Sequence, residues 1–197
     1  MSAAPKHHDK IVRAAADLFR RFGYAATGTN DIVAHSGAPK GSLYHYFPGG
    51  KAEIGAAAVA YAGSRVQATL AELIARHDGD AAAAVLAYGE LLVGWLNRSG
   101  YRDGCPIATV LLEVTPAEAG ITSAGQAVLA DWADLFAAAL KSHGVEARRA
   151  DDLGTLAVAL IEGSLLQARV AADGGPIRLA VAEAARQFGA AIAEARR

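Results

Sequence analysis

Alanine occupies 48 of the 197 positions, close to a quarter of the chain, and this abundance constrains the fold more than any other feature. Alanine is the strongest helix former, and the β-branched residues that favour strands are comparatively sparse. No stretch shows the sustained alternation of apolar and polar residues that a half-buried strand requires. The sequence therefore predicts an all-α protein.

All six prolines lie at the ends of periodic apolar stretches, where helices are expected to begin or stop. They help to divide the chain into about nine helices, expected at 6–22, 29–36, 39–47, 51–76, 80–97, 106–114, 122–143, 147–172 and from 176 to near the end. The first three helices are expected to form an N-terminal head domain. The long fourth helix links this head to a C-terminal helical domain, the body. We therefore expect one domain over residues 1–50 and a second over residues 51–197.

The first expected helix carries an apolar stripe formed by Ile11, Ala15, Leu18, Phe19 and Phe22. Its lysines and arginines lie mainly off this stripe. His7 and His8, at its start, fit either a mobile basic arm or simple surface residues.

Composition excludes several classes of protein. Hydrophobic residues make up 53% of the chain and charged residues 20%, which supplies a core and argues against disorder. No uninterrupted apolar run reaches the roughly 18 residues that span a bilayer, and the first residues lack the apolar segment of a signal peptide. Cys105 is the single cysteine, which precludes an intrachain disulfide. We expect a cytoplasmic protein without metal or cofactor.

The net charge of −1 hides an asymmetry. Residues 1–51 hold seven Lys and Arg against three Asp, whereas the remainder holds twelve Lys and Arg against seventeen Asp and Glu. A basic N-terminal quarter on an acidic body suggests that this quarter binds a polyanion. A local scatter of solvated charge fits the same numbers.

The segment GAPKGSLYHYF, residues 37–47, follows a short helix and a glycine-containing turn, which is the arrangement of a helix-turn-helix unit. At about 100° per residue, Leu43 and Phe47 point the same way and should pack on the two preceding helices. The other face is small and polar, and it is formed by Gly41, Ser42 and His45 with Tyr44 and Tyr46 on its shoulders. This face suits the major groove of DNA, but it also fits a surface helix whose tyrosines pack sideways.

The stretch TGTNDIVAHSGAPKGSLYHYFPGGKAEI resembles the DNA-binding domain of the TetR family of transcriptional regulators. The matching residues are Thr27, Asp31, Ile32, Gly37, Lys40, Gly41, Leu43, Tyr44, Tyr46, Phe47 and Lys51. The segment APKGSLYHYFPGGK and the later segment GCPIATVLLE are similar to sequences of the LmrA/YxaF branch of that family. The resemblance is strong over residues 6–60 and weaker through the body.

The resemblance implies a homodimer that binds a palindromic DNA operator as a repressor and is released by a small-molecule effector. It implies groove and backbone contacts from Lys40, Gly41, Ser42, Tyr44, His45 and Tyr46, and phosphate contacts from Thr27, Thr29 and Lys51. Family members often carry Ser or Thr where Gly28 stands. In this chain Thr27 or Thr29 must therefore supply the hydroxyl that caps the second helix and touches a phosphate.

The body holds few aromatic residues, and their spacing is informative. Tyr88 and Trp95 are seven apart and Trp132 and Phe136 four apart, so each pair shares a helix face. Ordinary core packing and an apolar pocket both fit this spacing. The family resemblance favours an effector cavity, with Asn97 as a further polar group and candidate residues Tyr88, Trp95, Cys105, Glu113, Trp132, Phe136 and Gln167. The implied effector is a mostly apolar, flavonoid-like or drug-like molecule.

The last two expected helices carry apolar stripes that must be covered, either by the core of the same chain or by a second copy. Family resemblance favours the copy, and a two-fold dimer would present two recognition helices to successive major grooves. The expected interface residues are Leu156, Leu160, Gly163, Val181, Ala185 and Phe188.

Other functions stay open from the residues alone. A helical carrier of small molecules would have the same body without DNA binding, and an activator would have the same helix-turn-helix as a repressor. An enzyme on a helical bundle needs an acid–base constellation, which we do not find. Cys105 lies at an expected helix start, where the dipole stabilises a thiolate, but a packed small residue is the simpler interpretation.

Overall fold

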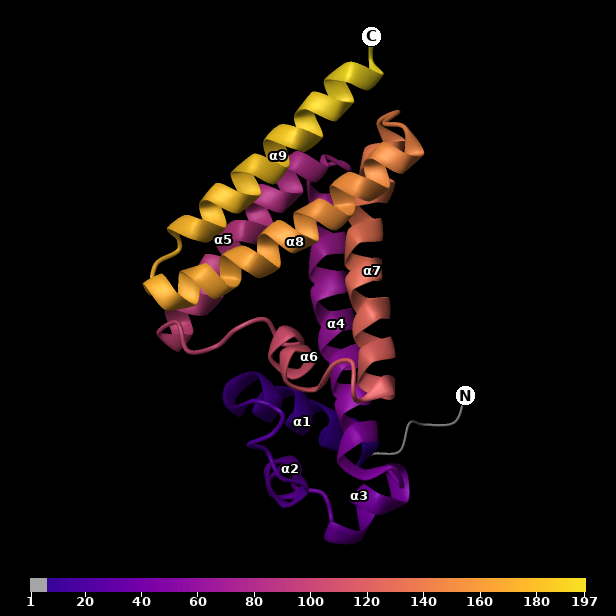
Figure 1. Cartoon of the computed structure of the whole chain (residues 1–197), viewed down its shortest axis with the longest axis vertical. Coiled ribbons are helices and arrows are strands. Elements are labelled where there is room, and N and C mark those ends of the chain that lie inside the picture. The colour runs from indigo at the N-terminus through magenta and orange to yellow at the C-terminus, as the bar shows by residue number, and fades with distance from the viewer. Residues whose placement is uncertain (1–6) are drawn as a thin grey trace. The chain divides into compact units, whose positions relative to one another are not determined.

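A computed structural model describes residues 7–197 of the chain. Within that range the protein forms nine α-helices and no β-strand, as the alanine content predicts. The helices are α1 (His8–Phe22), α2 (Thr29–Ser36), α3 (Lys40–Tyr46), α4 (Gly50–Arg76), α5 (Ala81–Ser99), α6 (Ala108–Val114), α7 (Ala119–Ser142), α8 (Ala147–Ala171) and α9 (Gly175–Ala195) (Figure 1). The expected first residue of the first helix, Lys6, lies outside the described range.

The helix ends follow local chemistry. Asp80 caps α5, because its Oδ1 accepts hydrogen bonds from the N–H groups of Ala82 (2.8 Å) and Ala83 (3.0 Å). Gly37 ends α2 in the left-handed conformation, with φ of 62°. The start of α6 differs from the prediction, since residues 106 and 107 form a turn and the helix begins at Ala108.

The packing divides the chain into two compact units. Unit 1 contains the described residues up to Ser64 together with Cys105–Val128, and unit 2 contains Arg65–Gly104 and Leu129–Arg197. Helix α6 and the first part of α7 therefore belong to the same unit as α1, α2 and α3. The functional boundary expected at residue 50 stays a prediction.

The core of unit 1 contains the apolar stripe predicted for α1. Ile11, Ala15, Leu18 and Phe19 are buried, together with Ile32 of α2 and with Leu43 and Phe47 of the α3 segment. The prediction was wrong for Phe22, whose side chain is 60% exposed. Helix α1 ends at Phe22 and Gly23 turns the chain, so this ring lies at the surface with the Arg21 guanidinium 5.6 Å from its centre.

Unit 2 is built around α9, which lies beside both α5 and α8 (Figure 1). A glycine permits the close approach of α5 and α9, since a Cβ at Gly89 would lie 2.6 Å from the Val181 side chain. An ion pair also joins these helices: the Arg178 guanidinium donates to both carboxylate oxygens of Glu90, at 2.8 and 3.2 Å. This pairing lowers the pKa of the Glu90 carboxyl.

One helix in the described part of the chain, α8, is long and apolar enough to cross a membrane by length and composition. Its buried residues, among them Leu153, Ile161 and Leu165, belong to the core of unit 2. The core helix of a soluble protein passes the same test, so α8 does not indicate a membrane protein.

Candidate DNA-binding surface and effector cavity

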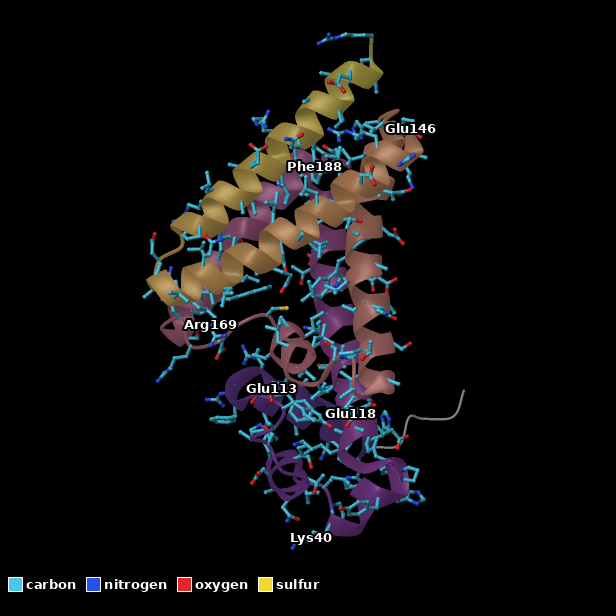
Figure 2. All side chains as sticks on the ribbon, in the orientation of Figure 1. Lys40, Glu113, Glu118, Glu146, Arg169 and Phe188 are labelled. Atoms are coloured by element: carbon cyan, nitrogen blue, oxygen red, sulfur yellow. The ribbon has the colours of Figure 1, made fainter. Side chains whose placement is uncertain are left out.

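Helix α3 separates packing residues from exposed residues as the helical wheel predicts. Leu43 is 1% exposed and Phe47 is buried with it, whereas Tyr44 is 64% exposed. Lys40, Gly41 and His45 are exposed, and Ser42 and Tyr46 are half-buried. Figure 2 shows the Lys40 side chain directed away from α1. The six residues predicted to contact the DNA groove and backbone are therefore all at least partly accessible.

The start of α1 supports the end of α3. The His8 imidazole stacks on the Phe47 ring, with 4.9 Å between ring centres, and meets the Tyr46 ring edge-on at 6.1 Å. The Tyr46 ring also contacts the His45 ring, at 4.9 Å. His8 is thus a packing residue rather than part of a mobile arm or plain surface, and it helps to fix Tyr46 on the exposed face.

Part of the basic charge of the N-terminal quarter is neutralised within unit 1. The Asp17 carboxylate lies 3.0 Å from Arg20, 3.7 Å from Arg21 and 3.3 Å from the His35 ring of α2. Asp17 therefore links α1 to α2. Lys40 at the start of α3 remains a cation on the exposed surface.

The two candidate threonines have different surroundings. Thr27 is only 3% exposed, and its hydroxyl donates to the Gly23 carbonyl at 2.8 Å, so this hydroxyl cannot reach a phosphate on the surface. Gly28 is the N-cap of α2, and its N–H donates to the Asp31 carboxylate at 2.9 Å. Thr29 is the half-buried first residue of α2. The phosphate contact predicted for Thr27 is thus corrected, and Thr29 remains the candidate.

Lys51 is bound within unit 1. Its ammonium lies 4.3 Å from the centre of the Tyr24 ring and donates to the Ala25 carbonyl at 3.4 Å. The side chain is half-buried. Lys51 therefore places a positive charge beside the turn between α1 and α2, and any phosphate contact would be made from that fixed position.

The structure places Glu113 at this same turn of unit 1. Its carboxylate accepts hydrogen bonds from the N–H groups of Tyr24 (2.9 Å) and Ala25 (2.6 Å). Gly23 allows this approach, because a Cβ there would lie 2.4 Å from a Glu113 oxygen. Burial, and after it the charge of Glu118, raise the pKa of the Tyr24 phenol.

Local sequence patterns do not predict the contact between Tyr24 and Glu113, although one signal is present. The motif GCPIATVLLE, which ends at Glu113, is one of the two stretches that resemble the LmrA/YxaF branch. A motif this distinctive outside the helix-turn-helix suggests a specific contact, but the motif by itself does not identify the partner.

Three of the predicted effector residues meet at one cavity of unit 2. Tyr88 of α5 and Trp132 and Phe136 of α7 line it together. Aliphatic walls come from Leu70 of α4 and from Val158 and Ile161 of α8. Glu162 of α8 is the single charged residue in the lining, and nothing in its local sequence predicts this position.

This cavity is small in the described conformation. Its volume is about 10 Å³, which is about enough for the centre of one water molecule. Drug-sized ligands occupy pockets of roughly 300–1,000 Å³. An effector that binds here must therefore separate the aromatic side chains or the helices that carry them.

The remaining effector candidates lie elsewhere. Trp95 contacts Tyr88 edge-on, with 6.3 Å between ring centres, but its indole is at the surface rather than in the cavity lining. Gln167 is exposed on α8, and Cys105 is buried within unit 1. None of these three side chains lines the cavity with Tyr88, so their expected effector role lacks structural support.

The predicted interface residues of α8 lie on an outward apolar stripe. Leu156 and Gly163 are exposed, Leu160 is half-buried, and no atom approaches within 4 Å of a Cβ built at Gly163. The stripe continues through Leu166, which is 61% exposed, and Val170, which is 82% exposed. On α9, Leu179 is 74% exposed.

Two interface residues predicted on α9 are instead part of the protomer core. Phe188 is buried with its ring 5.7 Å from that of Phe136, and Val181 is buried against Gly89. Ala185 is half-buried. The apolar stripe of α9 is thus covered by the same chain, and the prediction that Val181 and Phe188 contact a second copy is corrected.

Within residues 7–197, no group of three or more His, Cys, Asp or Glu side chains is arranged to hold a metal ion. The charged clusters described above, around Asp17 and Glu113, have protein partners.

A helix-turn-helix with an exposed polar recognition helix defines a DNA-binding protein of the transcription-regulator class. Residues 11–58 match the family model described as bacterial regulatory proteins of the tetR family. Residues 81–183 match the model described as the C-terminal domain of LmrA/YxaF-like transcriptional regulators.

Individual proteins agree with these matches. The regulator Rv0196 of Mycobacterium tuberculosis is 36% identical over 179 residues, which cover 87% of this chain and 88% of Rv0196. YxaF of Bacillus subtilis is 32% identical, with 91% and 93% covered. The crystal structure of a TetR regulatory protein from Rhodobacter sphaeroides superposes with a TM-score of 0.78 at 22% identity, covering 93% of this chain and 99% of that one. The chain belongs to the TetR family of transcriptional regulators, in its LmrA/YxaF-like branch.

Proposed function

We propose that this protein is a dimeric repressor that binds a palindromic DNA operator through α3 and leaves it when a small effector enters unit 2. The observation that carries the proposal is the exposed polar face of α3, which is held in place by the buried Leu43 and Phe47. Lys40 and the phenols of Tyr44 and Tyr46 suit phosphates and base edges. Thr29 and Lys51 are the proposed phosphate contacts at the starts of α2 and α4.

The outward stripe of α8 supports the dimer. Leu156, Leu166 and Val170 expose a continuous apolar surface, and Leu179 of α9 adds to the exposed apolar area of unit 2. Gly163 lies within the stripe and permits close backbone approach. If a second copy buries this stripe, the dimer would present two α3 helices to successive major grooves of DNA. Those grooves lie about 34–36 Å apart.

The cavity lined by Tyr88, Trp132 and Phe136 supports an effector site. Because the cavity is nearly closed, a ligand that enters it favours a more open arrangement of unit 2. Such a ligand shifts the DNA-binding equilibrium only by its difference in affinity for the two arrangements. Helix α4, which runs from Gly50 to Arg76 and contributes residues to both units, is the proposed carrier of the shift.

The experiment is a selection of bound duplexes from a random DNA library, followed by affinity measurements at several salt concentrations. We expect a palindromic sequence with two half-sites about one helical turn apart. Binding should weaken steeply with salt, because each phosphate contact releases counterions. Failure to enrich any sequence, together with affinity that does not respond to salt, would favour a small-molecule carrier over a regulator.

Repression and activation differ in what the bound dimer does to transcription. A reporter gene placed behind the selected sequence distinguishes them: a repressor lowers expression when the protein is supplied, and an activator raises it. We expect lower expression.

A further inference from the structure

We propose that the cavity of unit 2 selects effectors that carry a positive charge on an apolar or aromatic body, with Glu162 as the counter-ion. This inference rests on the proposed effector role of the cavity and adds the chemical class of the ligand. It follows from the combination of side chains in the lining: three aromatic rings, three aliphatic side chains and one carboxylate.

The aromatic rings favour a cation by their electronic structure. Tyr88, Trp132 and Phe136 come from two helices and converge on the same small space. The face of an aromatic ring is negative, so a cation within about 6 Å of the ring centre is attracted, most strongly by tryptophan. Groups of such rings are the recurring recognition site for ammonium groups in proteins.

Glu162 adds a carboxylate to this environment. It is half-buried and lines the same cavity from α8. A carboxylate has about four acceptor sites, so it can receive an ammonium N–H in addition to hydrogen bonds from protein groups. In surroundings poor in water the attraction between opposite charges is stronger than at the surface.

The same arrangement disfavours an anion. A ligand carboxylate in this cavity would meet the carboxylate of Glu162, with no cationic side chain in the lining to compensate. A neutral ligand of the same shape gains apolar burial but no ion pair. The predicted order of affinity is therefore cation, then neutral molecule, then anion.

A matched series of three compounds tests this order: 4-phenylbutylamine, 4-phenylbutanol and 4-phenylbutyrate, which share the apolar body and differ in charge. Isothermal titration calorimetry at neutral pH gives the Kd of each compound for the full-length protein. We expect the amine to bind about tenfold more tightly than the alcohol, and the acid to bind most weakly.

The variant Glu162→Gln removes the charge and keeps the shape. It should reduce the affinity for the amine to about that for the alcohol, while the affinity for the alcohol stays unchanged and shows that the cavity is intact. The control is Asp152→Asn, which removes one negative charge from an exposed position of the same helix. This control should leave the preference for the amine in place.

The outcomes separate the inference from the proposed function. Equal Kd values for amine and alcohol, or an amine preference that survives Glu162→Gln, would overturn the cation selectivity and leave an effector cavity standing. If none of the three compounds binds to protein that still binds its selected DNA, the ligand role of the cavity is wrong while DNA recognition holds. Loss of alcohol binding in Glu162→Gln would show that Glu162 supports the cavity rather than the cation.

Discussion

The Glu113 carboxylate of α6 accepts a hydrogen bond from the backbone N–H of Tyr24, at 2.9 Å, across 89 positions of sequence. The adjacent N–H of Ala25 donates to the other oxygen. One acidic side chain thus satisfies two consecutive backbone donors where α1 gives way to α2. Since α2 precedes the recognition helix, α6 helps to fix the geometry of the DNA-binding surface.

We expect Glu113→Ala to destabilise unit 1 by about 1 kcal/mol, because it removes two hydrogen bonds to a charged acceptor but leaves donors that water can reach. Hydrogen exchange at the amides of Tyr24 and Ala25 should accelerate, which mass spectrometry or NMR detects. The control is Glu72→Gln on α4, whose exposed carboxylate pairs with Arg76. Unchanged exchange in Glu113→Ala would contradict the assigned role.

Gly23→Ala should disturb the same turn more severely. Its φ of 85° is unfavourable for any side chain, and the new Cβ would lie against Glu113. We expect a loss of about 1–3 kcal/mol in the free energy of unfolding, measured by urea denaturation. If the double variant Gly23→Ala, Glu113→Ala is no less stable than Glu113→Ala alone, the clash rather than φ accounts for the loss.

Tyr44→Ala and Leu43→Ala should separate DNA contact from packing, although they alter neighbouring residues of α3. Tyr44→Ala removes an exposed ring, so we expect weaker binding to the selected DNA by roughly tenfold with unchanged stability. Leu43→Ala removes a buried side chain and should cost about 2–5 kcal/mol of stability. Gel shifts and urea denaturation measure the two quantities. Normal DNA affinity in folded Tyr44→Ala would refute the assignment of α3.

Thr29→Ala and Thr27→Val form a second matched pair. Thr29 is the remaining candidate for a phosphate contact of α2, so its substitution should weaken binding to all DNA sequences alike. The dependence of the affinity on salt should stay the same, because the hydroxyl carries no charge. Thr27→Val leaves the Gly23 carbonyl without its donor and should lower stability by about 1 kcal/mol. The reverse assignment would follow if Thr27→Val altered the affinity for DNA at unchanged stability.

Leu166→Glu should produce monomers. This position lies on the outward stripe of α8, and a carboxylate there would have to be buried without a partner in the dimer. Leu112→Glu on α6, where the leucine is even more exposed, is the control for a general effect of the substitution. Sedimentation equilibrium at micromolar concentration measures the mass. A dimer that persists in Leu166→Glu would place the interface on another surface.

The loss of folding stability at acidic pH should depend on Glu183. Hydrogen bonds from Arg186 and then from Gln187 lower the pKa of its carboxyl from 4.5 to about 2. A lowered pKa means that the contribution of this group is complete above pH 4.5 and is lost as the pH falls toward 2. In Glu183→Gln the urea midpoint of unfolding should therefore change less with pH over that interval. Glu194→Gln on the same helix should leave the pH dependence of the midpoint as it is.

The sequence by itself determined the helices and their exposed and buried sides where the signal is local. Alanine content, prolines and apolar periodicity act within one or two turns, and so they predicted nearly all helix positions. The separation of Leu43 from Tyr44 follows from helix geometry alone. The pairing of Trp132 with Phe136 follows in the same way from a spacing of four.

The tertiary structure decided what covers each face and which distant groups meet. Periodicity showed that Val181 and Phe188 lie on an apolar side of α9, but it could not tell whether the same chain or a second copy buries them. Glu162 is one acidic residue on a helix until the packing of four helices places aromatic rings opposite it. Glu113 reaches Tyr24 only through the fold, because a hydrogen bond between residues 89 positions apart leaves no periodic pattern in the sequence.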